Sequence, residues 1–219
     1  MRVLVVGGGG REHALCWALH RDDRAATLFA APGNPGTATL ATNLPVAATD
    51  LEGLVACGRR HHIDLVVVGP EAPLAAGIAD RFGDEGRAVF GPSAAAARLE
   101  ASKAFAKEVL AAAGVPTAAS RTFGDVASAR AFIDRHVEPL VVKASGLAAG
   151  KGVVVCTTRA EAAAAAQAML ALGKLGDAGR EIVIEDYLEG EELSVLALTD
   201  GERLMILPAA QDHKRLGEG

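Results

Sequence analysis

The 219-residue sequence contains few aromatic residues and few cysteines. Phe, Tyr and Trp together make up 4% of it, so we expect a core built mainly from Ala, Val and Leu. The cysteines Cys16, Cys57 and Cys156 are odd in number and far apart, and none belongs to a Cys-x-x-Cys pair. This pattern indicates neither a disulfide framework nor a zinc site, and it fits a reducing, cytoplasmic environment.

The sequence also lacks a long hydrophobic run and an excess of positive charge. No apolar stretch approaches the roughly 18 residues of a membrane span, and the run Val3–Val6 is too short for the core of a signal peptide. We therefore expect a protein that is not exported and has no membrane partner. Lys and Arg number 22 against 27 Asp and Glu, a net charge of −5, which argues against nucleic acid as a partner.

The first part of the chain alternates between apolar strands and helices. This alternation predicts an α/β fold with an open, doubly wound parallel sheet over residues 1–101. The expected strands are Arg2–Val6, Thr27–Ala31, Asp64–Val68 and Ala88–Phe90, and the expected helices are Glu12–His20, Leu51–His61, Leu74–Phe82 and Ser93–Leu99.

The pattern changes after residue 101, where an α+β, partly antiparallel region is expected. Ser102 can cap a helix that ends at Gly114, and Asp200-Gly201 indicates a hairpin turn. The expected strands are Ala119–Phe123, Leu140–Ala144, Val153–Cys156, Ile182–Glu185, Leu193–Leu198 and Leu204–Leu207, with helices at Val126–His136 and Arg159–Leu172.

A Gly-rich turn follows the first strand, within Val3–His13. Such a turn directs backbone N–H groups and a helix N-terminus toward an anion. The dinucleotide spacing Gly-x-Gly-x-x-Gly fails in both registers, because Glu12 and His13 stand where the third glycine is needed. NAD and FAD are therefore disfavoured. Phosphate binding is favoured over a merely tight turn because Arg11 and His13 add polar donors.

Two other strands of this half end in loops of the same kind. Ala31–Gly36 carries Asn34, and Gly69–Leu74 carries Glu71. Either loop alone fits an ordinary strand-to-helix turn. Since parallel strands present ligands at their carboxyl edge, we expect both loops to meet Val3–His13 at one crevice.

The second half contains a Gly-rich loop, Ser145–Gly152, that follows Lys143. It is not a P-loop, because Gly146 and Gly150 enclose three residues where four are needed and a strand follows it. A Gly-rich loop between antiparallel strands can instead close over a triphosphate, with backbone donors and Lys151 on the phosphates. Lys143 is expected to be a second phosphate contact, the alternative being a solvated edge lysine.

The acidic segment Ile182–Glu192 follows this loop. Its strand ends in Glu185-Asp186 and continues as Tyr187-Leu188. Backbone N–H and C=O groups of such a segment can bind adenine, while the Glu192 carboxylate accepts hydrogen bonds from the ribose hydroxyls. Charge alone would favour a solvated acidic turn, but the position after a phosphate-binding loop favours the nucleotide interpretation.

These segments together resemble one family. GGGGREHAL, APGNPG, GPEAPL, SGLAAGKG, IVIEDYLEGEE and QDHKR, in this order, closely resemble the glycinamide ribonucleotide synthetase family of ATP-grasp ligases. The resemblance extends from Met1 to Gly219. Other ATP-grasp ligases share the loop and the acidic segment, and it is GREHAL and GPEAPL that narrow the resemblance to this family.

The resemblance implies a division of the chain and a reaction. Residues 1–101 would form a domain on the phosphoribosylamine side, and residues 102–219 an ATP-grasp region with a lid subdomain at about 115–190. The implied reaction joins glycine to 5-phosphoribosylamine with ATP, giving glycinamide ribonucleotide, ADP and phosphate in purine biosynthesis. The partners would then be small molecules.

The resemblance also assigns residues to each side of the reaction. The implied nucleotide contacts are Lys103, Lys143, Ser145, Gly146, Leu147, Ala148, Ala149, Gly150, Lys151, Gly152, Glu185, Asp186, Tyr187, Leu188 and Glu192. The implied substrate contacts are Gly9, Gly10, Arg11, Glu12, His13, Gly33, Asn34, Gly69, Pro70 and Glu71. Asp212 and Lys214 would approach the reacting centre as catalytic residues.

Besides ATP, the resemblance implies Mg²⁺ or Mn²⁺, held by Glu and Asn ligands on a later strand of the family. No metal ligand is expected within these 219 residues, so we expect an N-terminal portion that is inactive in isolation. Two alternatives remain open at this stage: another ATP-grasp ligase, and a nucleotide-binding module without catalysis. A Rossmann oxidoreductase ranks third.

Overall fold

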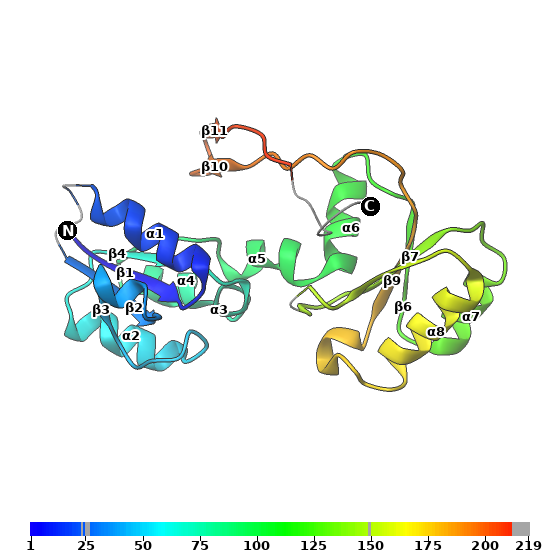
Figure 1. The fold of residues 1–219 in the computed structure, drawn as a ribbon, viewed down its shortest axis with the longest axis horizontal. Helices are drawn as coiled ribbons and strands as arrows, with labels where there is room; N and C mark the ends of the chain where they lie inside the picture. Colours follow the sequence, from blue (N-terminus) through cyan, green and yellow to red (C-terminus); the bar gives the residue numbers. More distant parts are fainter. Residues whose placement is uncertain (23, 25–26, 149, 212–219) are drawn as a thin grey trace. The chain divides into compact units, whose positions relative to one another are not determined.

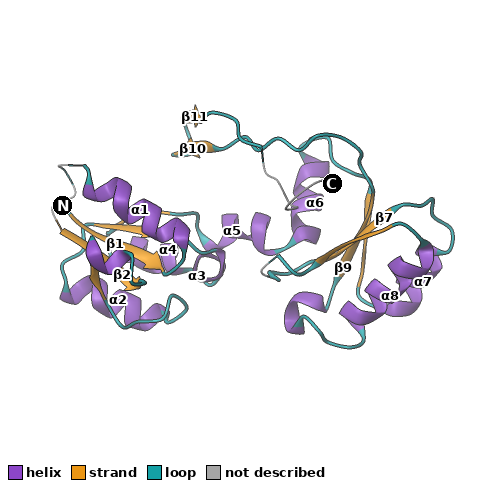
Figure 2. Ribbon diagram, in the orientation of Figure 1, coloured by secondary structure: helices purple, strands orange, loops and turns teal. Residues whose placement is uncertain are grey.

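The structure is a computed structural model that describes residues 1–22, 24, 27–148 and 150–211. The chain divides into two compact units, Met1–Asp186 and Tyr187–Gly219, each described here by itself. The first unit contains two separate sheets with their helices, and the second contains a short hairpin (Figures 1 and 2).

The first sheet is parallel throughout, as the alternating pattern predicts. Its strand order is β3-β2-β1-β4-β5. The chain leaves β1 toward one side of the sheet and returns to pair β4 on the other side, so a topological switch point lies between β1 and β4. The strands are β1 (Arg2–Gly7), β2 (Thr27–Pro32), β3 (Thr42–Asn43), β4 (Leu65–Val68) and β5 (Ala88–Phe90).

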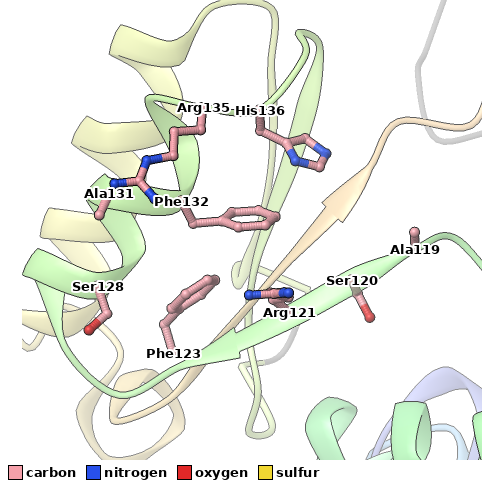
Figure 3. Close-up of a pocket in the computed structure, with 9 residues that line it drawn as sticks. All are labelled: Ala119, Ser120, Arg121, Phe123, Ser128, Ala131, Phe132, Arg135 and His136. Atoms are coloured by element: carbon pink, nitrogen blue, oxygen red, sulfur yellow. The ribbon is translucent and has the colours of Figure 1, made fainter.

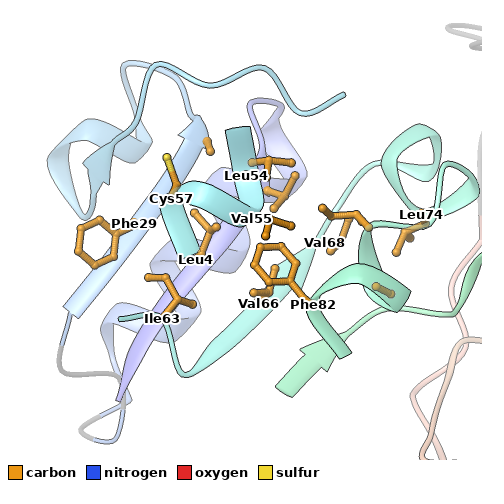
Figure 4. Close-up of a cluster of buried hydrophobic side chains, with 14 of the residues drawn as sticks. Leu4, Phe29, Leu54, Val55, Cys57, Ile63, Val66, Val68, Leu74 and Phe82 are labelled. Carbon is orange, nitrogen blue, oxygen red and sulfur yellow. The ribbon is translucent and has the colours of Figure 1, made fainter. Parts of the chain in front are cut away.

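Helices cover both faces of this sheet, because alternate strand residues point to opposite faces. Val3 and Val5 pack with Cys16 of α1 (Gly10–His20) on one face. On the other face, Leu4 belongs to a larger cluster with α2 (Leu51–Arg60) and α4 (Ile78–Asp84), shown in Figure 4. Within that cluster Leu4, Leu54 and Phe82 are fully buried, each worth about 1.5–3 kcal/mol of hydrophobic burial.

One expected helix of this half is wrong. The predicted helix Leu74–Phe82 is two helices, α3 (Glu71–Ala75) and α4. Gly77 lies between them with a φ of 90°, a left-handed conformation that other residues rarely adopt. The apolar pattern continues across this break, which is why periodicity alone merges the two helices. The sequence pattern also missed β3 and the short helix η1 (Thr37–Thr39).

The second sheet is antiparallel, with strand order β6-β9-β7-β8. Its helices α7 and α8 pack on the face formed by Val142 and Ile184, so Lys143 and Glu185 lie on the opposite face. The elements are α5 (Ala94–Ala101), α6 (Lys103–Ala112), β6 (Ser120–Phe123), α7 (Val126–Ile133), β7 (Leu140–Ala144), β8 (Val153–Cys156), α8 (Arg159–Leu170), η2 (Gly176–Gly179) and β9 (Ile182–Asp186).

The second unit contains the antiparallel pair β10 (Ala197–Thr199) and β11 (Leu204–Ile206). The predicted turn at Asp200-Gly201 is confirmed: the Asp200 carboxylate accepts from the backbone N–H groups of Glu202 and Arg203. The predicted strand Leu193–Leu198 is wrong in its extent, since β10 begins at Ala197 and only an isolated bridge, Ser194 to Ala210, precedes it.

Candidate functional site

Hydrogen bonds join the first two loops at the carboxyl edge of the parallel sheet. The Asn34 amide donates to the carbonyl oxygens of Gly8 at 3.0 Å and Gly9 at 3.1 Å. Asn34 is held in turn by Thr37, whose backbone N–H donates to the Asn34 side-chain oxygen at 2.9 Å. The loops after β1 and β2 therefore form one surface, as the sequence predicts.

The third loop joins them through Arg11. Its Nη1 donates to Glu71 Oε1 at 3.2 Å, which connects the loop after β1 to the loop after β4 across the switch point. The side chains of Arg11 and Glu71 are 56% and 48% exposed, so both charged groups face solvent. The pKa of Glu71 is lowered, first by its own backbone N–H and then by the Arg11 guanidinium, which keeps the carboxylate ionised.

Glu12 lies beneath the same loops. It is 4% exposed, and its Oε2 accepts from the Gly9 N–H at 2.6 Å while its Oε1 accepts from Arg11 Nε at 3.0 Å. A Cβ atom at Gly69 would lie 2.0 Å from Glu12 Oε1, so only glycine allows the β4 loop to approach this carboxylate. The geometry assigns Glu12 to holding the loops in place.

The remaining predicted substrate contacts line the same edge. The half-buried His13 ring lies against the backbone of Gly36, where a Cβ atom would come within 2.6 Å of it. Since α1 begins at Gly10, the N–H groups of its first turn face the loop side and can bind an anion. Also at this edge are Gly9, Gly33, Gly69 and Pro70.

A second cluster of predicted residues lies around Glu185, on the face of the antiparallel sheet opposite α7 and α8. Glu185 is 6% exposed. Its Oε2 lies 2.8 Å from Lys143 Nζ, and its Oε1 lies 3.4 Å from Lys107 Nζ. Lys143 is therefore an ion-paired residue of this face and not a freely solvated edge lysine.

Lys107 is a residue of this cluster that the sequence motifs did not indicate. It donates to Thr117 Oγ1 at 2.7 Å and to the Ala118 carbonyl oxygen at 3.0 Å, which fixes its ammonium group beside Glu185. Lys107 follows Lys103 by four residues on α6, and residues at that spacing share a helix face. That spacing was the signal by which it could have been found.

Lys103 completes a group of three lysines. Its Nζ donates to the Gly146 carbonyl oxygen at 3.3 Å. Burial lowers the pKa of Lys103 and the Lys143 ammonium lowers it further, whereas Glu100 and Glu185 act in the opposite direction. Three ammonium groups thus surround one buried carboxylate, and the positive charge left over suits a polyanion.

The ends of the Gly-rich loop are fixed to its surroundings. Ser145 is buried, its N–H donates to the Glu181 carbonyl oxygen at 2.9 Å, and its Oγ accepts from Ala104 N–H at 3.2 Å. Gly146 N–H donates to Ala178 at 3.1 Å, and Gly152 O accepts from Ala144 at 2.7 Å. Between these ends, Gly150 and Lys151 are exposed, Leu147 is 37% exposed and Ala148 is half-buried.

The other predicted residues lie elsewhere. Asp186 ends β9, and its Oδ1 lies 2.6 Å from His136 Nε2. Tyr187, Leu188 and Glu192 belong to the second unit. Ala149, Asp212 and Lys214 lie outside the described residues.

The architecture and the lysine group beside the Gly-rich loop are those of an ATP-grasp protein. The family model for the ATP-grasp (A) domain of phosphoribosylglycinamide synthetase matches residues 101–219, and the model for the N domain matches residues 1–100. The chain belongs to the phosphoribosylglycinamide synthetase family.

Curated relatives and solved structures agree with this family. The chain is 48% identical over its whole length to a phosphoribosylamine–glycine ligase of Yersinia pestis and 51% identical to one of Ralstonia nicotianae. It spans about half of their length, 52% of each. The crystal structure of the Thermotoga maritima phosphoribosylamine–glycine ligase matches 99% of the chain and 51% of its own, with a TM-score of 0.82 and 32% identity.

Two further observations concern metals and membranes. Within the part of the chain that the structure describes, no three His, Cys, Asp or Glu residues gather in a way that could hold a metal ion. These residues therefore do not fit the expected Mg²⁺ or Mn²⁺. In the same part of the chain, no helix has the length and apolar character needed to cross a membrane.

Proposed function

We propose that this chain supplies the phosphoribosylamine side and part of the nucleotide side of an ATP-dependent ligase that joins glycine to 5-phosphoribosylamine. The observation that supports this most is the presence of two separate anion-binding arrangements in a chain about half identical to phosphoribosylamine–glycine ligases. One is the surface at Arg11 and Glu71, where the sequence predicts a crevice, and the other is the lysine group around Glu185.

The lysine group is proposed to bind the phosphates of ATP. Lys103 and Lys143 stand beside the base of the Gly-rich loop, and Lys151 lies in its exposed part. Fixed ammonium groups stabilise the charge that moves during phosphoryl transfer without reorganising. Glu185 holds Lys107 and Lys143 in place, which makes it a positioning residue for the phosphates.

The crevice is proposed to bind 5-phosphoribosylamine. Its phosphate would lie on the first-turn N–H groups of α1 and on Arg11, since a helix N-terminus is a ready anion site. Glu71 would accept from the sugar hydroxyls or interact with the amine. Asn34 keeps the two loops at a fixed separation, so this substrate would be held in one orientation.

The reaction itself would proceed in two steps. The carboxylate of glycine attacks the γ-phosphorus of ATP, the bond to the β-phosphate oxygen breaks, and ADP leaves, giving glycyl phosphate. The amine of phosphoribosylamine then attacks the glycyl carbonyl carbon and expels phosphate, and the amine loses a proton. The chain's own residues contribute by orienting the reactants and neutralising charge. No ligand for the expected divalent metal is assigned to the described residues.

The proposed cellular setting follows from the cysteines. All three are free and buried, which suits a reducing compartment, and we propose the cytoplasm. The acidic net charge of −5 favours small molecules over nucleic acid as partners.

The test is ADP release by the protein at its natural length, with glycine and 5-phosphoribosylamine omitted in turn. We expect release that requires both compounds and yields glycinamide ribonucleotide. Release that is independent of phosphoribosylamine would contradict the proposed acceptor, even where ATP still binds.

A further inference from the structure

A pocket lies on the helix-covered side of the antiparallel sheet, where β6 meets α7. It has a volume of about 670 Å³ and is lined by Arg121 and Phe123 of β6 and by Phe132, Arg135 and His136 (Figure 3). Arg121 pairs in register with Ile184, whose side chain belongs to the core beneath α7 and α8. Arg121 and Phe123 are thus on the opposite face from Lys143 and Glu185.

Three aromatic rings form one wall of this pocket. The Phe123 and Phe132 ring centroids are 5.2 Å apart, and the Phe132 and His136 rings are stacked at 4.6 Å. The guanidinium carbon of Arg121 lies 5.9 Å from the Phe132 centroid. A planar ring can add to such a row, because aromatic rings favour offset-stacked and tilted neighbours at these separations.

Two guanidinium groups at the pocket, those of Arg121 and Arg135, form no ion pair with a carboxylate among the described residues. Each nearby carboxylate already has a partner. Asp125 accepts from the Ser128 backbone N–H, Asp134 pairs with Arg130, and Asp186 pairs with His136. The side chains of Arg121 and Arg135 are both exposed, so an incoming anion would not have to displace a partner.

From this combination we infer that the pocket between β6 and α7 binds an organic anion with a planar ring, separately from the nucleotide and sugar-phosphate sites. The ring would stack beside Phe123 and Phe132, and the anionic group would accept hydrogen bonds from Arg121 and Arg135. Guanidinium groups suit carboxylate and phosphate oxygens because their N–H donors can bind two oxygens at once.

Phenyl phosphate is a suitable probe because it joins a ring to a dianion. Titrated into the isotope-labelled protein, it should saturate and shift the backbone amide resonances of Arg121, Phe132 and His136. Inorganic phosphate and phenol, which each lack one of the two features, should bind at least about tenfold more weakly. Phenyl phosphate binding no more tightly than both of them would overturn the inference.

Substitutions locate the site. Arg121→Gln and Arg135→Gln should each weaken phenyl phosphate about tenfold or more. The matched control is Arg130→Gln, on α7 and paired with Asp134, which should leave affinity within about twofold. All three positions are exposed, and unchanged amide spectra elsewhere would confirm folding. Resonance shifts confined to Lys103, Lys143 and the Gly-rich loop, unaffected by Arg121→Gln, would place the probe at the proposed phosphate site and contradict this one.

Discussion

Arg11 and Glu71 meet at 3.2 Å across the switch point of the parallel sheet. They lie in the first turns of α1 and α3, the helices that follow β1 and β4, and these strands are neighbours because the strand order reverses between them. Each is about half exposed, and an exposed ion pair contributes only about 0–1 kcal/mol to stability. The pair therefore adds little to the stability of the fold, and the role proposed for it is in binding.

Replacement of this pair should separate the two proposed sites. We predict that Arg11→Ala and Glu71→Ala each reduce the affinity for glycinamide ribonucleotide by about tenfold or more, because a charge-assisted contact is lost. ATP affinity should stay within about twofold. Calorimetric titration measures both. Arg59→Ala is the control, since it breaks another exposed pair, with Glu85, and should change neither affinity.

The lysines should affect the phosphates of the nucleotide and not its base. Lys143→Ala and Lys151→Ala should each weaken ATP by about 1.5–3 kcal/mol, while adenosine binds almost as before. Lys174→Ala, an exposed lysine outside the loop, serves as the control in the same titrations. Equal losses for ATP and adenosine would mean that the strands beside the loop are disturbed, and the phosphate role would be refuted.

Glu12 should matter for stability as well as for binding. Glu12→Ala removes a buried carboxylate that accepts from the Gly9 N–H and from Arg11 Nε, so we predict a loss of about 1–3 kcal/mol in the free energy of unfolding. Urea denaturation measures this loss. Glu52→Ala, which removes the exposed partner of Arg81, should cost at most about 1 kcal/mol. Equal effects of the two changes would contradict the structural role of Glu12.

Lys103 should be unusually reactive toward acylating reagents. An ordinary lysine has a pKa of about 10.4. Because the pKa of Lys103 is lowered, its neutral amine forms at a lower pH than that of an ordinary lysine. Labelling with acetic anhydride at increasing pH, read by mass spectrometry, should modify Lys103 before a lysine of ordinary pKa. Bound ATP should protect it. Labelling of Lys103 only at ordinary lysine pH would contradict the arrangement of Lys103, Lys143 and the Gly146 carbonyl.

Sequence patterns predicted the features that depend on local chemistry. The parallel strands and the meeting of the loops at Asn34 and Glu71 follow from apolar runs that end in Gly and Pro residues, and the structure confirms them. The break at Gly77 was not predicted, because one residue in the left-handed conformation leaves the apolar pattern of the helix unchanged.

Features that depend on tertiary contacts were not predictable. Lys107 joins Glu185 through the packing of α6 against the antiparallel sheet; its spacing of four from Lys103 indicates a shared helix face but not this partner. Glu12 belongs to a recognisable motif, yet its burial between Gly9 and Gly69 depends on how two distant loops approach each other. The pocket of Arg121 and Arg135 likewise arises only when β6 lies beside α7.

The central claim is that the crevice at the edge of the parallel sheet binds the sugar phosphate. A crystal structure with glycinamide ribonucleotide, the stable product of the proposed reaction, tests it most directly. We predict that the ligand phosphate lies within about 3 Å of backbone N–H groups at the start of α1 and of Arg11, with the ribose beside Glu71. A phosphate bound at Lys103 and Lys143, or far from Gly9–His13, would contradict the account.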